Sequence, residues 1–245
     1  MDGSVKSWDI SKNFEVGIYY KEERDPVNSI AYNSSFDLFA SSHTLFTRIW
    51  KIRKEYFVKI EADYAIFEPT DLLLLNFPNS TDDRCRLVIG NEKGEIYFCD
   101  YVIGKSIRPR REPIRAHKKS VWKLVFNQSR KYVISCCKDD NTIIFWDPYN
   151  MDRLEEFTFA ESKMIKGFFW NQEREEILIS TGNNQIFFLE WHNNEHQIRR
   201  IYESEQAFGY NEMVFLSVND LKVLVVYTNE RRGMKNSYFI KYIYF

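Results

Sequence analysis

One short pattern recurs along the chain at a nearly constant interval. A turn residue is followed by an alternating apolar strand that ends in Trp-Asp, as in Asp140–Asp147 and again in Asp2–Asp9. The position of Trp146 is held elsewhere by Trp8, Trp50, Cys99 and Leu189, so that successive steps along the chain are 42, 49, 47 and 43 residues. A period of about 40–45 residues is typical of a unit of four antiparallel strands. The chain is therefore expected to fold as a series of such sheets.

Composition agrees with an all-β protein. Of the 245 residues, 17% are aromatic and 44% are hydrophobic, whereas glycine and proline number only 9 and 6. Aromatic side chains suit the half-buried surface of a sheet, and no stretch shows capped helical periodicity. The formal net charge of −1 gives no global reason to expect nucleic-acid binding. We expect one domain, 1–245, with repeated sheet segments (blades) at roughly 1–22, 26–62, 63–112, 115–160, 163–203 and 210–245.

The fullest version of the pattern lies in residues 115–160. His117 stands 29 residues before Trp146, and apolar strands are expected at 121–126, 132–137, 142–146 and 154–159. These residues resemble the WD-repeat (WD40-type) family, in which a His, a strand Ser or Thr, a turn Asp and the Trp form a buried hydrogen-bonded tetrad. The resemblance assigns three of these places to His117, Asp140 and Trp146, and the strand place to Cys136, so the network is expected to be incomplete. Asp2 and Trp8 hold the turn and Trp places in the first repeat.

The resemblance implies a WD40-type β-propeller of about five to six blades of four-stranded antiparallel sheets. Its first blade is incomplete, because Asp2 follows Met1 directly and no inner strands precede it. In one alternative, the strands expected at 213–227 lie inside the N-terminal pair and close the ring. In the other, the propeller is open and is completed by a partner or by further sequence. The sequence leaves both alternatives open.

Cysteine usage and hydropathy bear on the compartment. The four cysteines include no Cys-x-x-Cys pair, and Cys136 and Cys137 are adjacent, so they face opposite sides of a strand and are not expected to bridge. The first residues carry no apolar secretory stretch, and no apolar run reaches the roughly 18 residues of a spanning helix. We expect an intracellular protein without membrane association, either cytoplasmic, including cytoskeletal or ciliary settings, or nuclear.

Basic residues gather in residues 105–119, where seven Lys or Arg accompany a single Glu112. They could contact RNA phosphates or an acidic protein surface, but aromatic side chains for base stacking are missing, which favours a solvated loop between blades. The loops at 105–119, 61–71 and 229–237 are nevertheless the best candidates for recognition. The candidate partner-binding residues are Arg108, Arg110, Arg111, Arg115, Lys118, Lys119, Arg231 and Arg232.

Motifs for catalysis are missing from the sequence. It has no Gly-x-Ser-x-Gly elbow, no phosphate-binding loop and no Gly-x-Gly-x-x-Gly. His192 and His196 are four residues apart, but they belong to an Asn-rich turn that favours a surface loop over a metal site. We therefore expect no enzyme activity, cofactor, metal or small-molecule substrate.

The expected function is a non-catalytic scaffold that mediates protein–protein interactions within a larger multiprotein assembly. One alternative is a ribonucleoprotein component that contacts RNA through residues 105–119. The other is a structural subunit of a cytoskeletal or ciliary complex. The resemblance does not choose among these, because one fold serves many functions.

Overall fold

The computed structural model describes the backbone of residues 4–9, 14–21, 25–52, 57–77, 84–159, 164–172, 175–182, 185–192, 195–203, 209–217, 222–229 and 237–244. Side chains are described for residues 5, 25–51, 64–77, 84–159, 164–172, 175–182 and 185–190. Asp2, Arg231 and Arg232 lie outside the described residues, and only the backbone of Trp8 lies within them.

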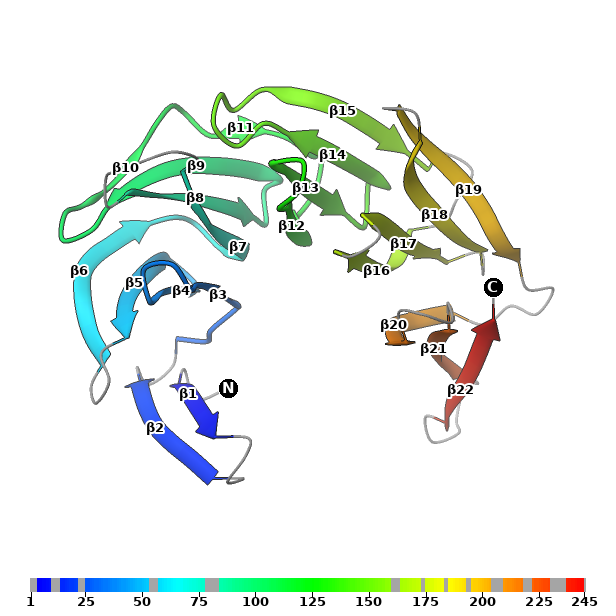
Figure 1. Cartoon of the computed structure of the whole chain (residues 1–245), viewed down its shortest axis with the longest axis horizontal. Helices are drawn as coiled ribbons and strands as arrows, with labels where there is room; N and C mark the ends of the chain where they lie inside the picture. The colour runs from blue at the N-terminus through cyan, green and yellow to red at the C-terminus, as the bar shows by residue number, and fades with distance from the viewer. Residues whose placement is uncertain are drawn as a thin grey trace. The chain divides into compact units, whose positions relative to one another are not determined.

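The described part of the chain is all-β, with 22 strands and no helix (Figure 1). It therefore offers no helix of the length and apolar character needed to cross a membrane. The chain forms two compact units. The first consists of residues 1–126, 131–136 and 144–156, and the second of 127–130, 137–143 and 157–245. The prediction of a single domain over 1–245 stays a prediction.

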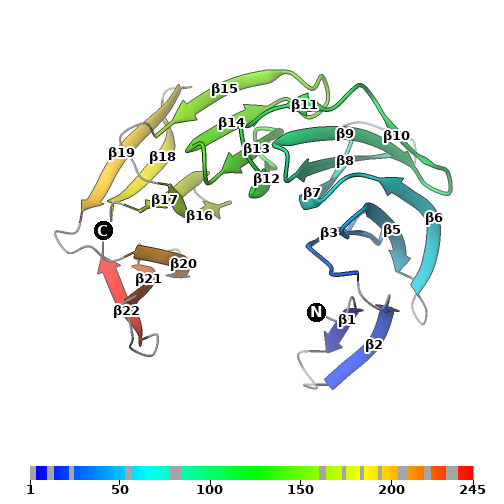
Figure 2. The ribbon, with the colours of Figure 1, turned by 180° about the vertical axis from the view of Figure 1, so that it is seen from behind.

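Three antiparallel sheets belong wholly to the first unit. The first sheet holds only β1 (Ser4–Asp9) and β2 (Phe14–Lys21). The second has the order β3 (Ser29–Asn33), β4 (Leu38–Ser42), β5 (Phe46–Ile52) and β6 (Phe57–Ala65). The third has the order β7 (Pro69–Asn76), β8 (Arg84–Asn91), β9 (Glu95–Val102) and β10 (Ile107–Pro109), and β11 (Ile114–Arg115) also pairs with β9. Figure 2 shows β8, β9 and β10 side by side from behind, as Figure 1 does from the front.

Three further antiparallel sheets follow along the chain. The sheet β12–β15 consists of β12 (Lys123–Asn127), β13 (Tyr132–Cys137), β14 (Thr142–Trp146) and β15 (Arg153–Thr158). The next consists of β16 (Ile165–Asn171), β17 (Glu176–Thr181), β18 (Gln185–His192) and β19 (Glu195–Glu203). The last has three strands, β20 (Gly209–Ser217), β21 (Lys222–Asn229) and β22 (Ser237–Tyr244).

These sheets confirm the predicted all-β fold with four-stranded antiparallel units. The two-stranded first sheet agrees with a first repeat that lacks its inner strands. Closure of the ring by the strands expected at 213–227 and the open propeller both stay predictions.

Two segments predicted as loops are largely strand. Residues 61–71 belong to β6 and β7 except for a short connection at 66–68. The predicted surface loop at His192–His196 is the end of a hairpin, because His192 pairs with Glu195 across β18 and β19. Polar residues also occur along the solvent face of strands, so the polarity of these segments does not by itself indicate a loop.

Packing between neighbouring sheets of the first unit buries the central strands on both faces. Every residue of β4 is buried, and so is every residue of β8 except Arg84, whereas two of the three residues of the outer strand β10 are exposed. One core cluster joins Leu38 and Ile49 to Leu72 and Leu87 of the next sheet. Full burial of one such side chain contributes roughly 1.5–3 kcal/mol. The sheets are therefore held together mainly by contacts across their faces.

Candidate functional site

The segment that precedes β12 carries His117 and is fixed by the turn between β8 and β9. The carbonyl of Gly94 accepts hydrogen bonds from the backbone N–H groups of Ala116 and His117, both at 3.0 Å. Gly94 has a φ of 81°, and a Cβ at this position would lie 2.3 Å from the carbonyl oxygen of His117. A glycine is therefore needed for the turn to hold His117 this closely.

His117 belongs to a buried hydrogen-bond network with Ser135 and Trp146. The indole Nε1 of Trp146 donates to Ser135 Oγ at 2.9 Å, and Nε2 of His117 lies 2.8 Å from the same oxygen. A hydroxyl both donates and accepts, so one side chain can serve two buried rings. We call these three residues the β13 network.

The β13 network corrects the predicted role of Cys136. Ser135 supplies the hydroxyl, and the two residues face opposite sides of β13 because side chains alternate along a strand. The expected gap in the network does not exist. The error is a shift of one residue, which a single sequence cannot resolve where Ser and Cys are adjacent and both suit a buried strand.

Asp140 stabilises the turn that joins β13 and β14. Its Oδ1 accepts a hydrogen bond from the backbone N–H of Thr142 at 3.1 Å and another from the Thr142 hydroxyl at 2.5 Å. The next residue, Asn141, has a φ of 58°, which Asn tolerates better than most residues. The predicted turn role of Asp140 thus has a direct geometric basis in its own hairpin.

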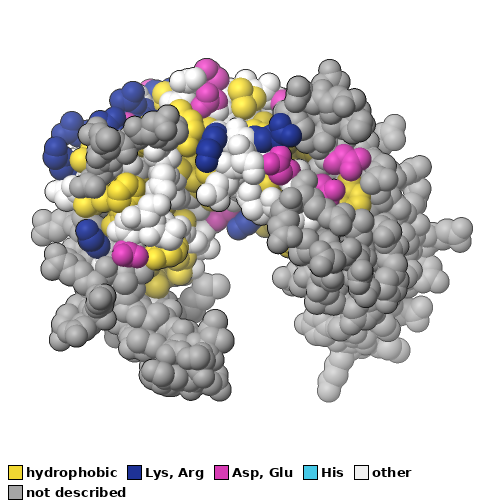
Figure 3. All heavy atoms as spheres, in the orientation of Figure 1, with side chains coloured by type: hydrophobic (Ala, Val, Ile, Leu, Met, Phe, Trp, Pro, Cys, Tyr) yellow, Lys and Arg dark blue, Asp and Glu magenta, His cyan; other side chains and the backbone are white. Residues whose placement is uncertain are grey.

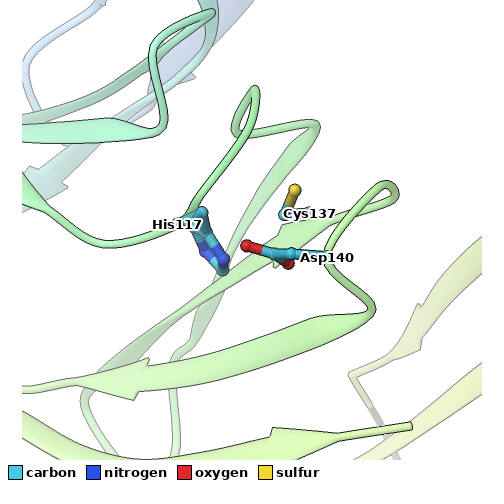
Figure 4. A group of neighbouring side chains, drawn as sticks. All are labelled: His117, Cys137 and Asp140. Atoms are coloured by element: carbon cyan, nitrogen blue, oxygen red, sulfur yellow. The ribbon is translucent and has the colours of Figure 1, made fainter. Parts of the chain in front are cut away.

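His117, Cys137 and Asp140 gather at one end of the sheet β12–β15 and are potential metal ligands (Figure 4). The donors do not suit a metal as they stand. Nε2 of His117 is bonded to Ser135 Oγ, and burial raises the pKa of the Cys137 thiol to about 11. A thiol must lose its proton to bind a metal. The three side chains are better explained as part of the fold, and we propose no metal here.

A second network of the same kind lies in the sheet β3–β6, where sequence reasoning found only Trp50. The Trp50 indole donates to Ser41 Oγ at 3.0 Å, and Nε2 of His43 lies 2.9 Å from that oxygen. Asp25 faces the other ring nitrogen, with its Oδ2 3.7 Å from His43 Nδ1, and its Oδ1 accepts the backbone N–H of Thr44 at 3.0 Å. We call Ser41, His43 and Trp50 the β4 network. A Ser-x-His placed before a strand Trp is the signal that could have revealed it.

One buried carboxylate contacts residues of three consecutive sheets. Asp71 on β7 accepts a hydrogen bond from the Ser29 hydroxyl on β3 at 2.5 Å and another from the backbone N–H of Leu124 on β12 at 2.8 Å. Lys123 Nζ lies 3.2 Å from the same carboxylate. Burial of a carboxylate is costly unless such partners satisfy it. Asp71 is therefore fixed by its neighbours on both sides.

The basic segment 105–119 runs along β9, which corrects the predicted inter-blade loop over its first part. Residues 107–109 pair with 99–101 as β10, and residues 114–115 pair with 95–96 as β11. The segment therefore supplies the outer strand of its sheet, and only the rest leads into the next blade. Figure 3 shows Lys and Arg side chains gathered at the upper left, the region where Figure 1 places β10.

Some predicted partner-binding residues are already engaged in the fold. Arg111 donates to the carbonyl oxygen of Met151. Arg115 donates to the carbonyl oxygens of His117 at 3.1 Å and Lys118 at 3.3 Å. These two guanidinium groups help to position the connection into β12. They have less capacity left for a partner than a free Arg.

Asp100 lies at the centre of a charged cluster on the outer part of the same sheet. Its Oδ1 accepts a hydrogen bond from Arg86 Nε at 2.8 Å, and its Oδ2 lies 3.3 Å from Arg110 Nε. Arg86 is only 1% exposed and also donates to the carbonyl oxygen of Pro148. Burial lowers the pKa of Arg86, and Asp100 opposes that shift by stabilising the charged form. The buried guanidinium thus holds Asp100 in place.

A cavity of about 330 Å³ opens beside this cluster, and we call it the β10 pocket. It brings together Arg108 and Arg110 from the predicted set, whereas Arg111, Arg115, Lys118 and Lys119 are not among its lining residues. The lining residues are Arg84, Asp100, Val102, Lys105, Ser106, Arg108, Pro109 and Arg110. Arg84 and Lys105 were not singled out as sites from the sequence, because only the pairing of β10 with β9 brings them beside Arg108.

Comparison with known families identifies one repeat. Residues 108–147 match the family described as WD domain, G-beta repeat. The match covers His117, Ser135 and Trp146, so the suspected WD-repeat resemblance is confirmed at this part of the chain. None of the curated proteins compared with the chain matches it.

Proposed function

We propose that this protein is a non-catalytic scaffold that binds other proteins as a subunit of a larger intracellular assembly. WD-repeat domains in general serve as interaction platforms, and the repeat at residues 108–147 supports that class here. The rigid sheets supply the frame, and exposed residues at their edges supply recognition.

The observation that carries this proposal is the contrast between buried and exposed polar groups. The imidazoles of His43 and His117 are buried and hydrogen-bonded to serine hydroxyls, which suits a structural role better than proton transfer with a substrate. In contrast, Arg108, Lys118 and Lys119 are exposed. These exposed cations are suited to recognise a negatively charged partner.

A co-purification experiment tests the scaffold proposal. The tagged full chain is compared with Arg108→Glu/Lys119→Glu and with the control Lys131→Glu/Arg153→Glu, which changes the net charge equally at other exposed positions. Proteins that co-purify with the wild type should be depleted about tenfold or more by the first variant and retained by the control. If both variants retain the co-purifying proteins equally, the basic segment is not the surface that binds them.

RNA binding is the second candidate, because the same cations could contact phosphates. A phosphate-dominated complex loses affinity steeply as salt is added. Reversal of Arg110 and Arg111 together should then abolish salt-sensitive RNA binding. The structure gives this candidate less support, since Arg110 lies beside Asp100 and Arg111 donates to Met151. Absence of salt-sensitive binding to the wild type would exclude it.

A further inference from the structure

We propose that the β10 pocket binds a phosphorylated side chain of a partner protein. This inference rests on the proposed scaffold function and specifies the chemistry of one contact. Three features of the pocket support this inference: the charge of its lining, the pairing of β10 in the sheet, and the size of the cavity.

The described residues of the lining have an excess of positive charge. They include four cations, Arg84, Lys105, Arg108 and Arg110, and one carboxylate, that of Asp100. Both oxygens of that carboxylate already have partners, Arg86 for Oδ1 and Arg110 for Oδ2. This part of the lining therefore favours an anionic ligand.

Lys105 and Arg108 are the cations best placed to bind such a ligand. Both are exposed, and neither forms an ion pair with a residue that the structure describes. A guanidinium offers paired donors that match the oxygens of a phosphate, and an ammonium adds a compact charge. A phosphate group carries nearly two negative charges at neutral pH, so it gains more from this lining than one carboxylate would.

Arg108 lies on a strand that is paired in the sheet, and Lys105 lies in the turn before it, where its backbone N–H donates to the carbonyl oxygen of Val102 at 2.9 Å. Arg108 pairs with Asp100 in the register of β10 and β9, and Ile107 pairs with Tyr101. Ile107 is buried in the core cluster, whereas Ser106 and Arg108 beside it are exposed. The buried Ile107 thus anchors β10 and directs its neighbours toward solvent. A site on a paired strand loses less conformational entropy on binding than one on a free loop.

The size and composition of the pocket favour a peptide over RNA. A cavity of about 330 Å³ is large enough for a phosphorylated side chain and part of the chain that bears it. None of the described residues that line it has an aromatic ring, whereas single-stranded RNA is held largely by stacking of its bases on aromatic side chains. We therefore commit to a phosphopeptide as the ligand and treat RNA as an outcome of the test.

Fluorescence anisotropy on the full chain tests the pocket. The probe is a labelled peptide pool with a central phosphoserine between randomised residues, and the same pool with serine is the reference. Binding of the phosphoserine pool should be about tenfold tighter, and millimolar inorganic phosphate should compete with it. Equal binding of the two pools, or tighter binding of a labelled oligouridine, would overturn the proposal.

Two variants of equal charge localise the effect. Arg108→Glu should weaken phosphopeptide binding about tenfold, whereas Lys119→Glu, outside the pocket but in the same basic segment, should change it less than about twofold. Arg108→Lys should recover part of the lost affinity, because it keeps the charge without the paired donors. Thermal melting of each variant confirms that it is folded. Equal losses from Arg108→Glu and Lys119→Glu would show general electrostatic attraction and overturn the site.

The pocket and the scaffold proposal fail in different ways. If partners co-purify and depend on the basic surface while the phosphoserine pool does not bind, the pocket is wrong and the scaffold stands. If the pool binds through Arg108 while co-purification is unaffected by Arg108→Glu/Lys119→Glu, the pocket binds a phosphorylated ligand but not one from an assembly partner. That result would overturn both the partner assignment and this interface.

Discussion

The sheets β3–β6 and β12–β15 both use a strand serine to hydrogen-bond a buried indole and a buried imidazole, but the imidazole comes from a different position in each repeat. Each has a serine on its second strand whose Oγ lies within hydrogen-bond distance of an indole and an imidazole. In the β13 network the imidazole comes from the segment before the first strand, at His117. In the β4 network it comes from the turn after the second strand, at His43, while Asp25 before the first strand supplies a carboxylate.

The two networks have the same hydrogen-bond geometry although their residues occur in a different order along the chain. Buried ring N–H groups need acceptors, and a strand hydroxyl provides one wherever the ring originates. Strands β12 to β14 fall within the recognised repeat, with His117 in the family place, whereas the sheet β3–β6 lies outside it. The sheet β3–β6 reaches an equivalent arrangement with the His and the acid exchanged, so a pattern based on residue order misses it.

Truncation of the two tryptophans should have the largest effect and should separate the two sheets. Trp146→Ala and Trp50→Ala should each lower the free energy of unfolding by about 3–5 kcal/mol. Trp146 should be the more costly, since among the described residues it shares its core cluster with eight others, whereas Trp50 shares its cluster with Val5 and Phe39. Urea denaturation measures both values. A larger loss at Trp50 would contradict the ranking by core size.

Removal of the shared hydroxyls should test whether the two networks are equivalent. Ser135→Ala and Ser41→Ala should each cost about 1–3 kcal/mol, because each leaves an indole and an imidazole without their common partner. Ser135→Thr should keep most of the stability. Cys136→Ser should not rescue Ser135→Ala, because its hydroxyl would lie on the other face of β13. Rescue would show that the one-residue correction is wrong.

Alkaline pH should destabilise both regions, and should act over a wider range beside the β4 network. Burial raises the pKa of Cys99 from 9.0 to about 12, and Cys99 belongs to the cluster that contains Leu38 and Ile49. Burial raises the pKa of Cys137, on β13, only to about 11, so its contribution levels off at a lower pH.

A raised thiol pKa means that the folded state keeps its proton where the unfolded chain loses it. The resulting stability is complete below about pH 9 and is lost as pH rises toward 12, by up to about 1.4 kcal/mol per pH unit. Hydrogen exchange between pH 8 and 12, corrected for its intrinsic pH dependence, should show peptides of β4 and β5 still losing protection above about pH 11, where the loss in β13 levels off. Cys99→Val should reduce this loss, and an unchanged pH profile would refute the cause.

Removal of the carboxylates near the networks should have the smallest effect. Asp25→Ala loses the bond from the Thr44 backbone and the acid that faces His43, and Asp140→Ala loses the two bonds from Thr142. Each should lower stability by about 0.5–1.5 kcal/mol. Similar losses would support equivalent roles in the two sheets. A loss of several kcal/mol for Asp25 alone would show that its carboxylate is part of the β4 network itself.

Much of the fold could be predicted because strand alternation and the Trp period are local signals. The strands at 132–137 and 142–146 were placed correctly for this reason. Cys136 was misassigned because the choice between neighbouring residues depends on which face of β13 meets the imidazole. The β4 network was missed because its His lies outside the place that the family pattern reserves for one.

The β10 pocket could be predicted only in part. The charge of residues 105–119 is visible in the sequence, but the pairing of Arg108 with Asp100 is not. Neither is the use of Arg111 and Arg115 as donors to backbone carbonyls, which depends on the path of the chain after β11. Contacts with distant residues therefore decide which basic residues of 105–119 stabilise the fold and which are accessible to a partner.

Asp71 has a consequence for how the first unit comes apart. Its carboxylate, on β7, has partners on both β3 and β12. If β7 separates from either strand, the carboxylate loses part of its partners while it stays packed against the other strand. Repeat proteins often fray from one end, since each repeat contacts only its neighbours. Here fraying should stop short of β7, and the three sheets should open in one concerted event. Single-molecule stretching would register that event as one large extension rather than three separate steps.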